Sequence, residues 1–317
     1  MTTRVIGIDA GGTKLLAGLV DEDLTVHRRV LRRWRGEDTD GVLDVLVGAI
    51  AEVRAGTGDV AAVGVGIPSQ VDFERGRSMS SVHLPLWDVP VRDLLAERLG
   101  LPVYVDNDAN LAALAEQRRG VAAGADHVVM LTLGTGIGGG LVLGGRLYRG
   151  ASGAAAEIGH MVVDPDGPPC QGSCRNRGCL EALASGRALA RAGAEAAARE
   201  PRSALGRAVA EGREMTGELV TELAMAGDAT ARAVLEDVGS KLGLGIANLV
   251  NIFNPQVVVV GGGASAAGEL LLEPARAVVR RQVLPPSRDE VRVERARFGE
   301  EAGMLGAALL ALEEGRA

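Results

Sequence analysis

The sequence predicts an α/β fold in which one unit with the element order βββαβαβα occurs twice, so that two lobes face each other across a cleft. Each half opens with a strand, a glycine turn and a second strand, and the same order of elements follows both openings. A length of 317 residues is also long for a single hydrophobic core. These observations together predict a duplicated, two-lobed molecule.

Short β-branched runs and helix-period apolar positions locate the elements of each half. The first half is predicted to contain strands at 5–9, 15–20, 25–34, 60–67 and 103–105 and helices at 42–53, 91–99 and 110–119. The second half is predicted to contain strands at 128–133, 141–143, 146–149, 257–260 and 291–293, helical sequence from 180 to 251, a helix after 263 and a last helix at 301–312. We place the smaller lobe at 1–119 and the larger lobe at 120–300.

Composition limits the partners and the compartment. A net charge of −7 argues against a nucleic-acid partner, whose phosphates are met by a basic surface. No apolar run approaches the ~20 residues needed to span a bilayer. The chain opens on a strand-like run at Val5 without the leader typical of secretion. We therefore expect a cytoplasmic protein that binds neither nucleic acid nor membrane.

Two glycine turns, at 10–14 and 134–140, each join consecutive strands. Glycine permits positive φ and lets backbone N–H groups converge on an anion, so both turns are candidates to hold nucleotide phosphates. Either turn alone could be an ordinary hairpin, but two in register favour phosphate binding. Asp9 is a candidate to hold Mg²⁺ through water. The candidate nucleotide-binding residues are Asp9, Gly11, Gly12, Thr13, Lys14, Gly134, Thr135, Gly136, Gly138, Gly262 and Gly263.

The turn at 134–139 also satisfies the G-x-G-x-x-G pattern of dinucleotide-binding proteins. That pattern needs a helix directly after the loop. Residues 140–143 are instead short and apolar and precede Gly144-Gly145, which predicts a strand entering a hairpin. We therefore reject a dinucleotide site. The glycines at 261–263 follow a predicted strand, and their bare backbone suits contact with an adenine or ribose.

Three polar residues, Asp106, Asn107 and Asp108, follow the predicted strand at 103–105. Polar side chains at the carboxyl end of a buried strand face the cleft of an open α/β sheet. Phosphoryl transfer to an alcohol needs a carboxylate to accept the hydroxyl proton and a group to position the alcohol, so Asp108 is the candidate base and Asn107 the positioning residue. The alternative is that an aspartate caps the next helix. For Asp106 we favour that cap or a solvated turn.

A histidine and all three cysteines follow the pattern His160-x9-Cys170-x3-Cys174-x4-Cys179. An odd number of cysteines in a reducing compartment disfavours disulfides, and three thiolates with one imidazole suit tetrahedral zinc. Such a zinc would be structural, because the protein supplies all four ligands. The alternative is three unrelated thiols in a loop. The metal would direct Glu181 toward the cleft, where Glu181 and Glu157 could accept hydrogen bonds from sugar hydroxyls.

Together these segments resemble the ROK family of repressors, uncharacterised reading frames and sugar kinases. The resemblance covers the whole chain, is closest to the bacterial ATP-dependent glucokinases, and rests on the segments 9–14, 106–110, 133–140, 157–160 and 174–181. It implies an actin-like ATPase (ribonuclease H-like) fold whose last helix, 301–317, packs back on the N-terminal lobe. It also implies ATP-dependent phosphorylation of a hexose at its 6-hydroxyl, with glucose as the expected sugar.

The resemblance further implies roles for single residues. It implies Asp108 as catalytic base, ATP with Mg²⁺, structural zinc on His160 and the cysteines, and a homodimer or higher homo-oligomer. The sugar ligands that it implies are Gly66, His83, Asn107, Glu157, His160 and Glu181. The alternatives are a kinase for mannose, fructose or an N-acetylated amino sugar, polyphosphate as donor, and a sugar-sensing protein without catalysis.

The sequence departs from the family pattern at three places. Three residues separate Cys170 from Cys174, where the family usually has one. The turn Pro68-Ser69-Gln70 lacks the glycine that often follows its proline, and His83 replaces a sugar-binding asparagine of many relatives. The family's repressors carry a winged-helix domain before the first glycine turn. Because eight residues precede Asp9 here, we expect a kinase and not a repressor.

Overall fold

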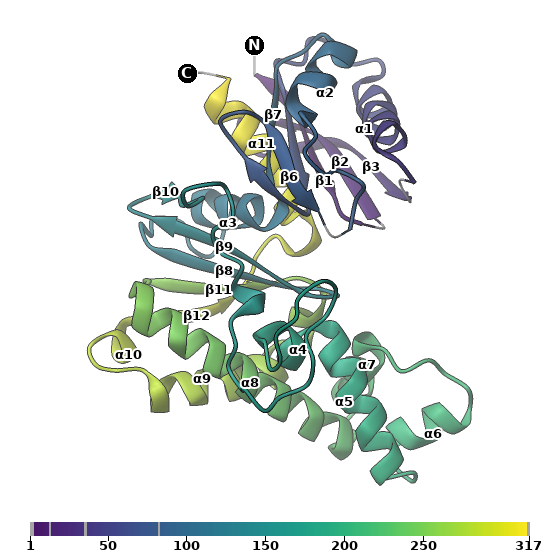
Figure 1. Cartoon of the computed structure of the whole chain (residues 1–317), viewed down its shortest axis with the longest axis vertical. Helices are drawn as coiled ribbons and strands as arrows, with labels where there is room; N and C mark the ends of the chain where they lie inside the picture. The colour runs from purple at the N-terminus through teal and green to yellow at the C-terminus, as the bar shows by residue number, and fades with distance from the viewer. Residues whose placement is uncertain (1–2, 13, 35–36, 82, 316–317) are drawn as a thin grey trace.

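The structure, a computed structural model of the chain, describes residues 3–12, 14–34, 37–81 and 83–315. Two five-stranded sheets lie one beyond the other along the molecule (Figure 1). Their strand orders, β3-β2-β1-β4-β7 and β10-β9-β8-β11-β12, give each strand of one sheet a counterpart in the other. The predicted duplicated α/β fold is confirmed. Thr13 and residues 316–317 of the predicted last helix lie outside the described residues.

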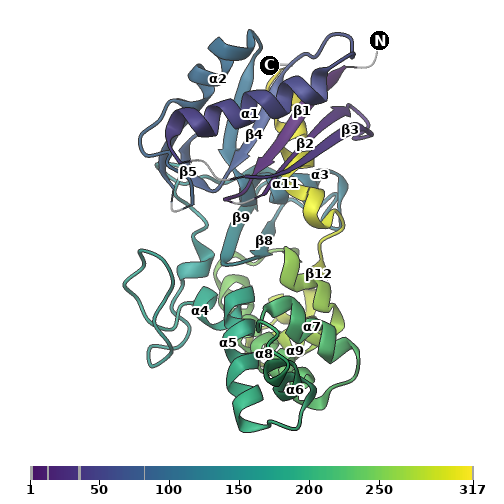
Figure 2. The same cartoon turned by 90° about the vertical axis from the view of Figure 1, so that its right-hand side faces the viewer.

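The first sheet contains β1 (Arg4–Ala10), β2 (Lys14–Asp21), β3 (Val26–Arg33), β4 (Val63–Ile67) and β7 (Val103–Asn107). β1, β2 and β3 pair antiparallel, whereas β1, β4 and β7 pair parallel. Helices α1 (Thr39–Arg54) and α2 (Val91–Leu99) cover one face, and α11 (Ala302–Glu314) covers the other (Figure 2). The parallel strands therefore end together at one edge.

The second sheet contains β8 (Val128–Leu133), β9 (Ile137–Leu143), β10 (Arg146–Leu147), β11 (Val257–Gly261) and β12 (Arg292–Arg295), with the same pattern of antiparallel and parallel pairs. Helix α3 (Asp108–Arg119) packs on one face, and a helical layer packs on the other. The remaining elements are η1 (Ile158–His160), α4 (Leu180–Ala184), α5 (Gly186–Arg199), α6 (Ala204–Ala210), α7 (Gly217–Met225), α8 (Ala229–Phe253), η2 (Gly263–Ala267), α9 (Glu269–Gln282), α10 (Ser287–Glu290) and η3 (Gly299–Glu301). No helix in the described part of the chain is long and apolar enough to cross a bilayer.

Helices α3 and α11 pack against each other between the two sheets. Glycines allow this approach, because a Cβ at Gly64 would lie 1.8 Å from the carbonyl oxygen of Ala307. A Cβ at Gly306 would lie 1.8 Å from the carbonyl oxygen of Leu111. The backbones of β4, α11 and α3 are thus in direct contact, which a side chain at either position would prevent.

Two segments differ from the sequence prediction. Strand β9 begins at Ile137, so the second glycine turn is shorter than 134–140 and three of its glycines lie within a strand. Residues 69–81, for which no element was predicted, form a two-stranded sheet of β5 (Ser69–Asp72) and β6 (Arg77–Ser81). This hairpin lacks an apolar signal because its buried side chains include Ser69 and Ser78, which hydrogen-bond to each other.

We expect Gly64→Ala to lower the free energy of unfolding by about 2 kcal/mol or more, because the new methyl group would overlap the backbone of α11. Gly58→Ala is the control, since Gly58 is exposed and no atom lies within 4 Å of its Cβ position. Denaturant unfolding followed by circular dichroism measures both variants. A Gly64→Ala midpoint equal to that of the wild type would contradict the close packing.

Candidate active site

The candidate catalytic residues lie where the parallel strands of the first sheet end. Asp9 is near the end of β1, β7 ends at Asn107, and α3 begins at Asp108. A Cβ at Gly66 in β4 would lie 2.9 Å from a methyl group of Leu111 and 3.5 Å from the Cα of Asp108. The predicted sugar ligand Gly66 therefore has a packing role, because glycine lets α3 start close to β4.

Asn107 is the N-cap of α3. Its Oδ1 accepts hydrogen bonds from the backbone N–H groups of Ala109 (2.9 Å) and Asn110 (3.1 Å). Its Nδ2 donates to the carbonyl oxygen of Ser69 at 3.2 Å. The alternative that an aspartate caps this helix is wrong, because the asparagine between the two aspartates makes the cap. The cap fixes the amide of Asn107 beside Asp108.

The expectation that Asp106 is a cap or lies in a solvated turn is wrong. Its side chain is 1% exposed. Its Oδ1 accepts from the backbone N–H of Asn107 (2.7 Å) and from Nδ2 of Asn110 (3.0 Å), and its Oδ2 accepts from Nε of Arg149 (2.7 Å). The buried charge is thus paired by an arginine that lies 43 residues further along the chain.

Asp108 lies among charged groups from both halves of the chain. Burial raises the pKa of its carboxyl group, and the negative charge of Glu157 adds to the rise. A hydrogen bond from the backbone N–H of Ala109 (2.8 Å) and the charge of His83 oppose it. A raised pKa makes the carboxylate a stronger base toward an alcohol proton. The structure therefore places Asp108 of the first half near Glu157 of the second.

Asp9 is a second carboxylate close to Asp108. Burial, followed by the negative charge of Asp108, raises the pKa of Asp9 to about 7, and the charge of Lys14 partly opposes this. A Cβ at Gly303 would lie 2.6 Å from the carboxyl group of Asp9, so the start of α11 lies against it. A carboxylate that is desolvated and repelled in this way is stabilised by a nearby cation.

The first glycine turn packs against the segment that carries His83. Gly11 and Gly12 do not adopt a positive φ. Instead, a Cβ at Gly12 would lie 3.0 Å from the Cβ of His83, so glycine allows close approach. Nζ of Lys14 lies 2.5 Å from an oxygen of Glu300, and both side chains are exposed. Thr13, the remaining candidate in this turn, lies outside the described residues.

The second glycine turn is joined to Glu181. Oε2 of Glu181 accepts a hydrogen bond from the backbone N–H of Ile137 at 2.8 Å, and a Cβ at Gly136 would lie 2.1 Å from the same oxygen. Gly134 and Thr135 are exposed, and the Cβ position of Gly134 faces open space. Positive φ occurs at none of the predicted glycines between 134 and 138.

Two further predicted glycines have packing roles. A Cβ at Gly138 would lie 2.6 Å from Oγ1 of Thr132. Gly262 has a φ of 81°, and a Cβ there would lie 2.6 Å from the backbone of Leu133, so glycine is required. Gly263 faces open space at the start of η2. The glycines at 262–263 therefore lie beside the end of β8, next to the second turn.

A small pocket lies between the two halves. It is lined by Ser69, Gln70, Asn107, Asn110, Gly138, Gly139, Gly153, Ala155, Ala156 and Glu157. The predicted sugar ligands Asn107 and Glu157 therefore face the same space. The sequence did not single out Gln70, whose Nε2 donates to Oε1 of Glu157 at 3.2 Å, or Asn110, whose buried Oδ1 has no partner among the described residues. No local signal marks either residue, because tertiary packing brings them to the pocket.

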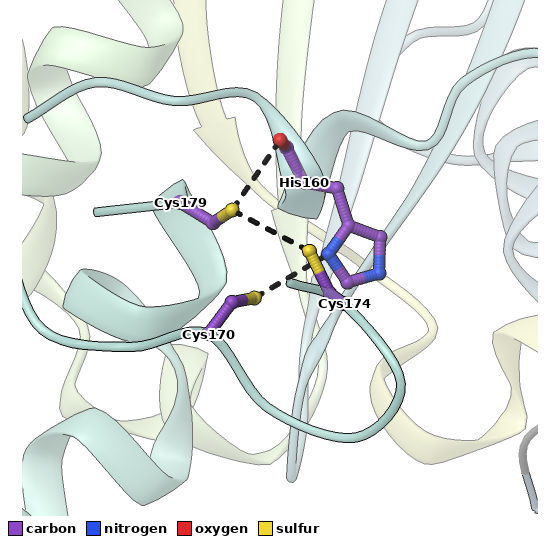
Figure 3. Close-up of side chains that lie close together, drawn as sticks. All are labelled: His160, Cys170, Cys174 and Cys179. Atoms are coloured by element: carbon purple, nitrogen blue, oxygen red, sulfur yellow. Dashed lines mark hydrogen bonds between the residues drawn. The ribbon is translucent and has the colours of Figure 1, made fainter. Parts of the chain in front are cut away.

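His160 and the three cysteines form one cluster (Figure 3). Their ligand atoms all lie within 4.8 Å of one another. Nδ1 of His160 is 3.5 Å from Sγ of Cys170, and Sγ of Cys174 is 3.9 Å from Sγ of Cys179. Figure 3 shows the other ring nitrogen of His160 directed away from the sulfurs. The unusual spacing of Cys170 therefore does not keep it out of the cluster.

Two of the three thiols, those of Cys170 and Cys179, have a raised pKa. Burial, and after it the hydrogen bond with Cys179, raises the pKa of Cys170 to about 12. Burial also raises the pKa of Cys179. Three thiols and an imidazole at these separations are a donor set that a divalent metal could bind as thiolates, and binding would release protons.

Comparison with known proteins identifies the family of the chain. The model of the ROK family matches residues 5–314. This chain belongs to the ROK family. A glucokinase of Thermotoga maritima is 38% identical to it over 312 residues, with 98% of both chains covered. The crystal structure of a ROK family glucokinase from Streptomyces griseus in complex with glucose and AMPPNP superposes with a TM-score of 0.87 at 38% identity, covering 98% of this chain and 99% of that one.

A regulator of the same family is also similar in structure. The crystal structure of a ROK family transcriptional regulator, a homologue of the E. coli MLC protein, superposes with a TM-score of 0.89 at 30% identity. The match covers 98% of this chain and 79% of the regulator. The ROK fold of this chain thus occurs both in kinases and in regulators, and the residues of the site have to decide between these functions.

We expect Asp9→Asn to raise the stability of the metal-free and nucleotide-free protein, and to do so more at high pH. The pKa of Asp9 is 3.8 unperturbed and about 7 in the folded protein. The folded state therefore keeps a proton that the unfolded state releases, and stability falls as pH rises from about 4 to about 7. Asparagine removes this penalty, so the melting temperature should exceed that of the wild type by ~5 °C at pH 8 and match it near pH 4.

Differential scanning calorimetry at several pH values measures the effect. Asp59→Asn is the control, because Asp59 is exposed and its substitution should give no pH-dependent difference. A difference between Asp9→Asn and the wild type that stays constant from pH 4 to pH 8 would contradict the burial of the Asp9 charge.

Proposed function

We propose that the chain is an ATP-dependent glucokinase that transfers the γ-phosphoryl group of ATP to the 6-hydroxyl of glucose. The observation that carries the proposal is the position of Asp108, a half-buried carboxylate of raised pKa at the start of α3, near Glu157 of the other half. Glucokinases that are 38% identical over nearly the whole chain support glucose as the sugar. A regulator would not require a carboxylate poised in this way.

The sugar would bind between the halves. Asp108 would accept the proton of the 6-hydroxyl as that oxygen attacks the γ-phosphorus. Asn107, which the helix cap holds in place, and Glu157 face the pocket between the halves. The ring nitrogen of His160 that points away from the thiols would be free for a sugar hydroxyl (Figure 3). Glu181, Gly66 and His83 complete the proposed sugar site.

The nucleotide would bind along the glycine turns. Gly134 and Gly263, whose Cβ positions are open, leave bare backbone for phosphate or ribose contact, and Lys14 is within reach of an anion once it leaves Glu300. Gly11, Gly12, Thr135, Gly136, Gly138 and Gly262 shape the turns. A bound Mg²⁺ neutralises phosphate charge during transfer. Asp9, repelled by Asp108, is the residue that such a cation would relieve.

The His160 and cysteine cluster would hold structural zinc. Three thiolates and one imidazole are a typical closed zinc donor set. The loop that carries the cluster also carries His160, and α4 with Glu181 begins directly after Cys179. The metal would therefore fix two of the proposed sugar ligands. We further propose that residues 1–119 with the last helix form the small lobe and residues 120–300 the large lobe, with the sugar bound in the cleft between them.

We expect Asp108→Asn to lower kcat by ~10² or more while the fold persists, because the amide cannot accept the hydroxyl proton. A coupled assay of ADP release, run over glucose, mannose, fructose and N-acetylated amino sugars, measures this and names the substrate. Near wild-type turnover in Asp108→Asn would remove Asp108 from the mechanism. Sugar binding without ADP release from any sugar would favour a sensor over a kinase.

We expect the purified protein to contain about one zinc per chain and to lose it to a strong chelator with a fall in melting temperature of several degrees. Cys174→Ser should bind zinc weakly and should no longer respond to the chelator. Zinc affinity should fall as pH falls, because burial raises the pKa of the Cys170 and Cys179 thiols and each must lose a proton to bind. Elemental analysis and calorimetry measure these effects. A metal-free protein that ignores the chelator would contradict the zinc site.

A further inference from the structure

Arg149 joins the two halves of the chain beside the candidate active site. It follows β10, at the start of the loop 149–157 that ends with Glu157. Its Nε and Nη2 both lie 2.7 Å from Oδ2 of Asp106. The carboxylate of Asp106 is 1% exposed and belongs to the first half. Charge-assisted hydrogen bonds of this kind are strong and fix geometry as well as charge.

The same guanidinium also lies over an aromatic ring. The guanidinium carbon of Arg149 is 3.8 Å from the centroid of Phe73, which directly follows β5. A cation above a ring at this distance is attracted by the negative face of the ring. The arginine therefore contacts two separate segments of the first half, the end of β7 and the β5–β6 hairpin.

The rest of the loop is attached to the same hairpin. Gly153 has a φ of 78°, and a Cβ there would lie 1.8 Å from the carbonyl oxygen of Val71 in β5. Gln70 of β5 donates a hydrogen bond to Glu157 at the end of the loop. The loop from Arg149 to Glu157 thus meets the hairpin at its beginning, its middle and its end.

Asp106 also contacts the segment that carries Asp108. Its Oδ1 accepts from the backbone N–H of Asn107 and from Nδ2 of Asn110, on the first turn of α3. One buried carboxylate therefore connects Arg149 to the segment with Asn107 and Asp108, while the loop of Arg149 leads to Glu157.

We propose that Arg149 is a positioning residue for the sugar site. Through Asp106 and Phe73 it holds Glu157 in register with Asn107 and Asp108 before the sugar binds. The inference rests on the proposed hexose kinase function. We call the contact of Arg149 with Asp106 and Phe73 the arginine clamp. A site that is already assembled loses less entropy on binding, so the clamp acts on sugar affinity more than on the chemical step.

Net stabilisation of the fold does not explain the pair by itself. Desolvation of two charges offsets much of their attraction, so a buried ion pair adds little stability compared with a well-packed neutral pair. Asp106 is also the least exposed carboxylate in any ion pair that the described residues form, the next being Asp21 at 11%. The contribution that remains is the fixed direction of the contact across the two halves.

The test compares the wild type with the double variant D106N/R149Q, which keeps a hydrogen-bonding pair at both positions and leaves no buried charge unpaired. We expect its KM and its calorimetric Kd for glucose to rise about tenfold, because the half-sites are no longer preassembled. The KM for ATP and kcat should change by less than about threefold. Arg149→Lys, which keeps the charge but not the planar fork, should give an intermediate rise.

Arg98→Gln is the matched control. Arg98 pairs with Asp40 and Asp44 inside the first half, so its loss should leave every constant for glucose unchanged. Amide hydrogen exchange should also speed up at 149–157 and 69–81 in D106N/R149Q and not in Arg98→Gln.

Two outcomes would overturn the proposal. One is a folded D106N/R149Q whose KM for glucose stays within about twofold of the wild type, which would leave Arg149 with a purely structural role. The other is an equal rise in the KM values for glucose and ATP, which would indicate a general loosening. Failure of the proposed function is a separate result, because in that case the wild type itself would release no ADP with any sugar and the clamp would have no sugar site to position.

Discussion

The active-site region depends on how several carboxylates are accommodated close together at the junction of the two halves. Asp9, Asp106, Asp108 and Glu157 lie at this junction, where burial and then the charge of a neighbouring carboxylate (Asp108 for Asp9, Glu157 for Asp108) raise the pKa of Asp9 and of Asp108. Among these four, Asp106 alone has a cationic partner in direct contact within the described part of the chain, and that partner is Arg149. The other carboxylates are left for ligands, since a metal ion brings positive charge and sugar hydroxyls bring hydrogen-bond donors. The repulsion among these groups in the free protein is thus a source of binding energy for the substrates.

Close backbone packing makes this junction possible. α11 lies directly on β4 and α3 because Gly64 and Gly306 lack side chains, and α3 begins close to β4 because of Gly66. The helix from the end of the chain therefore covers the sheet from its beginning, while α3 packs on the second sheet. The two helices between the sheets therefore join both halves. Because α3, which begins at Asp108, packs directly on α11 at these glycines, the geometry at Asp108 is coupled to the packing of α11.

The His160 and cysteine cluster and the contacts of Arg149 both involve the loops of the second half. The cluster fixes His160 and the start of α4, which carries Glu181, and Glu181 in turn binds the backbone of the second glycine turn. Arg149 attaches the loop that ends in Glu157 to the first half. Polar contacts hold these loops, and in the proposed site a metal would add to them, whereas hydrophobic packing holds the sheets. A sugar would therefore meet three acceptor groups whose positions are set by three different kinds of contact.

The sequence by itself determined the duplicated order of strands and helices, the nature of the two glycine turns as strand connections, and the candidate set Asp108, His160 and the cysteines. These follow from local signals, because period, glycine and ligand spacing are written in neighbouring residues. The structure alone decided that Asn107 and not an aspartate caps α3, that Asp106 is buried on Arg149, and that residues 69–81 form a hairpin. It also decided that most of the predicted glycines serve close packing at ordinary φ. The burial of Asp106 on Arg149 and most of the glycine contacts depend on partners tens of residues away, and no local pattern records which distant group will pair a charge or fill a space. The cap and the hairpin are local, but neighbouring polar residues offered alternatives between which only the packed structure decided.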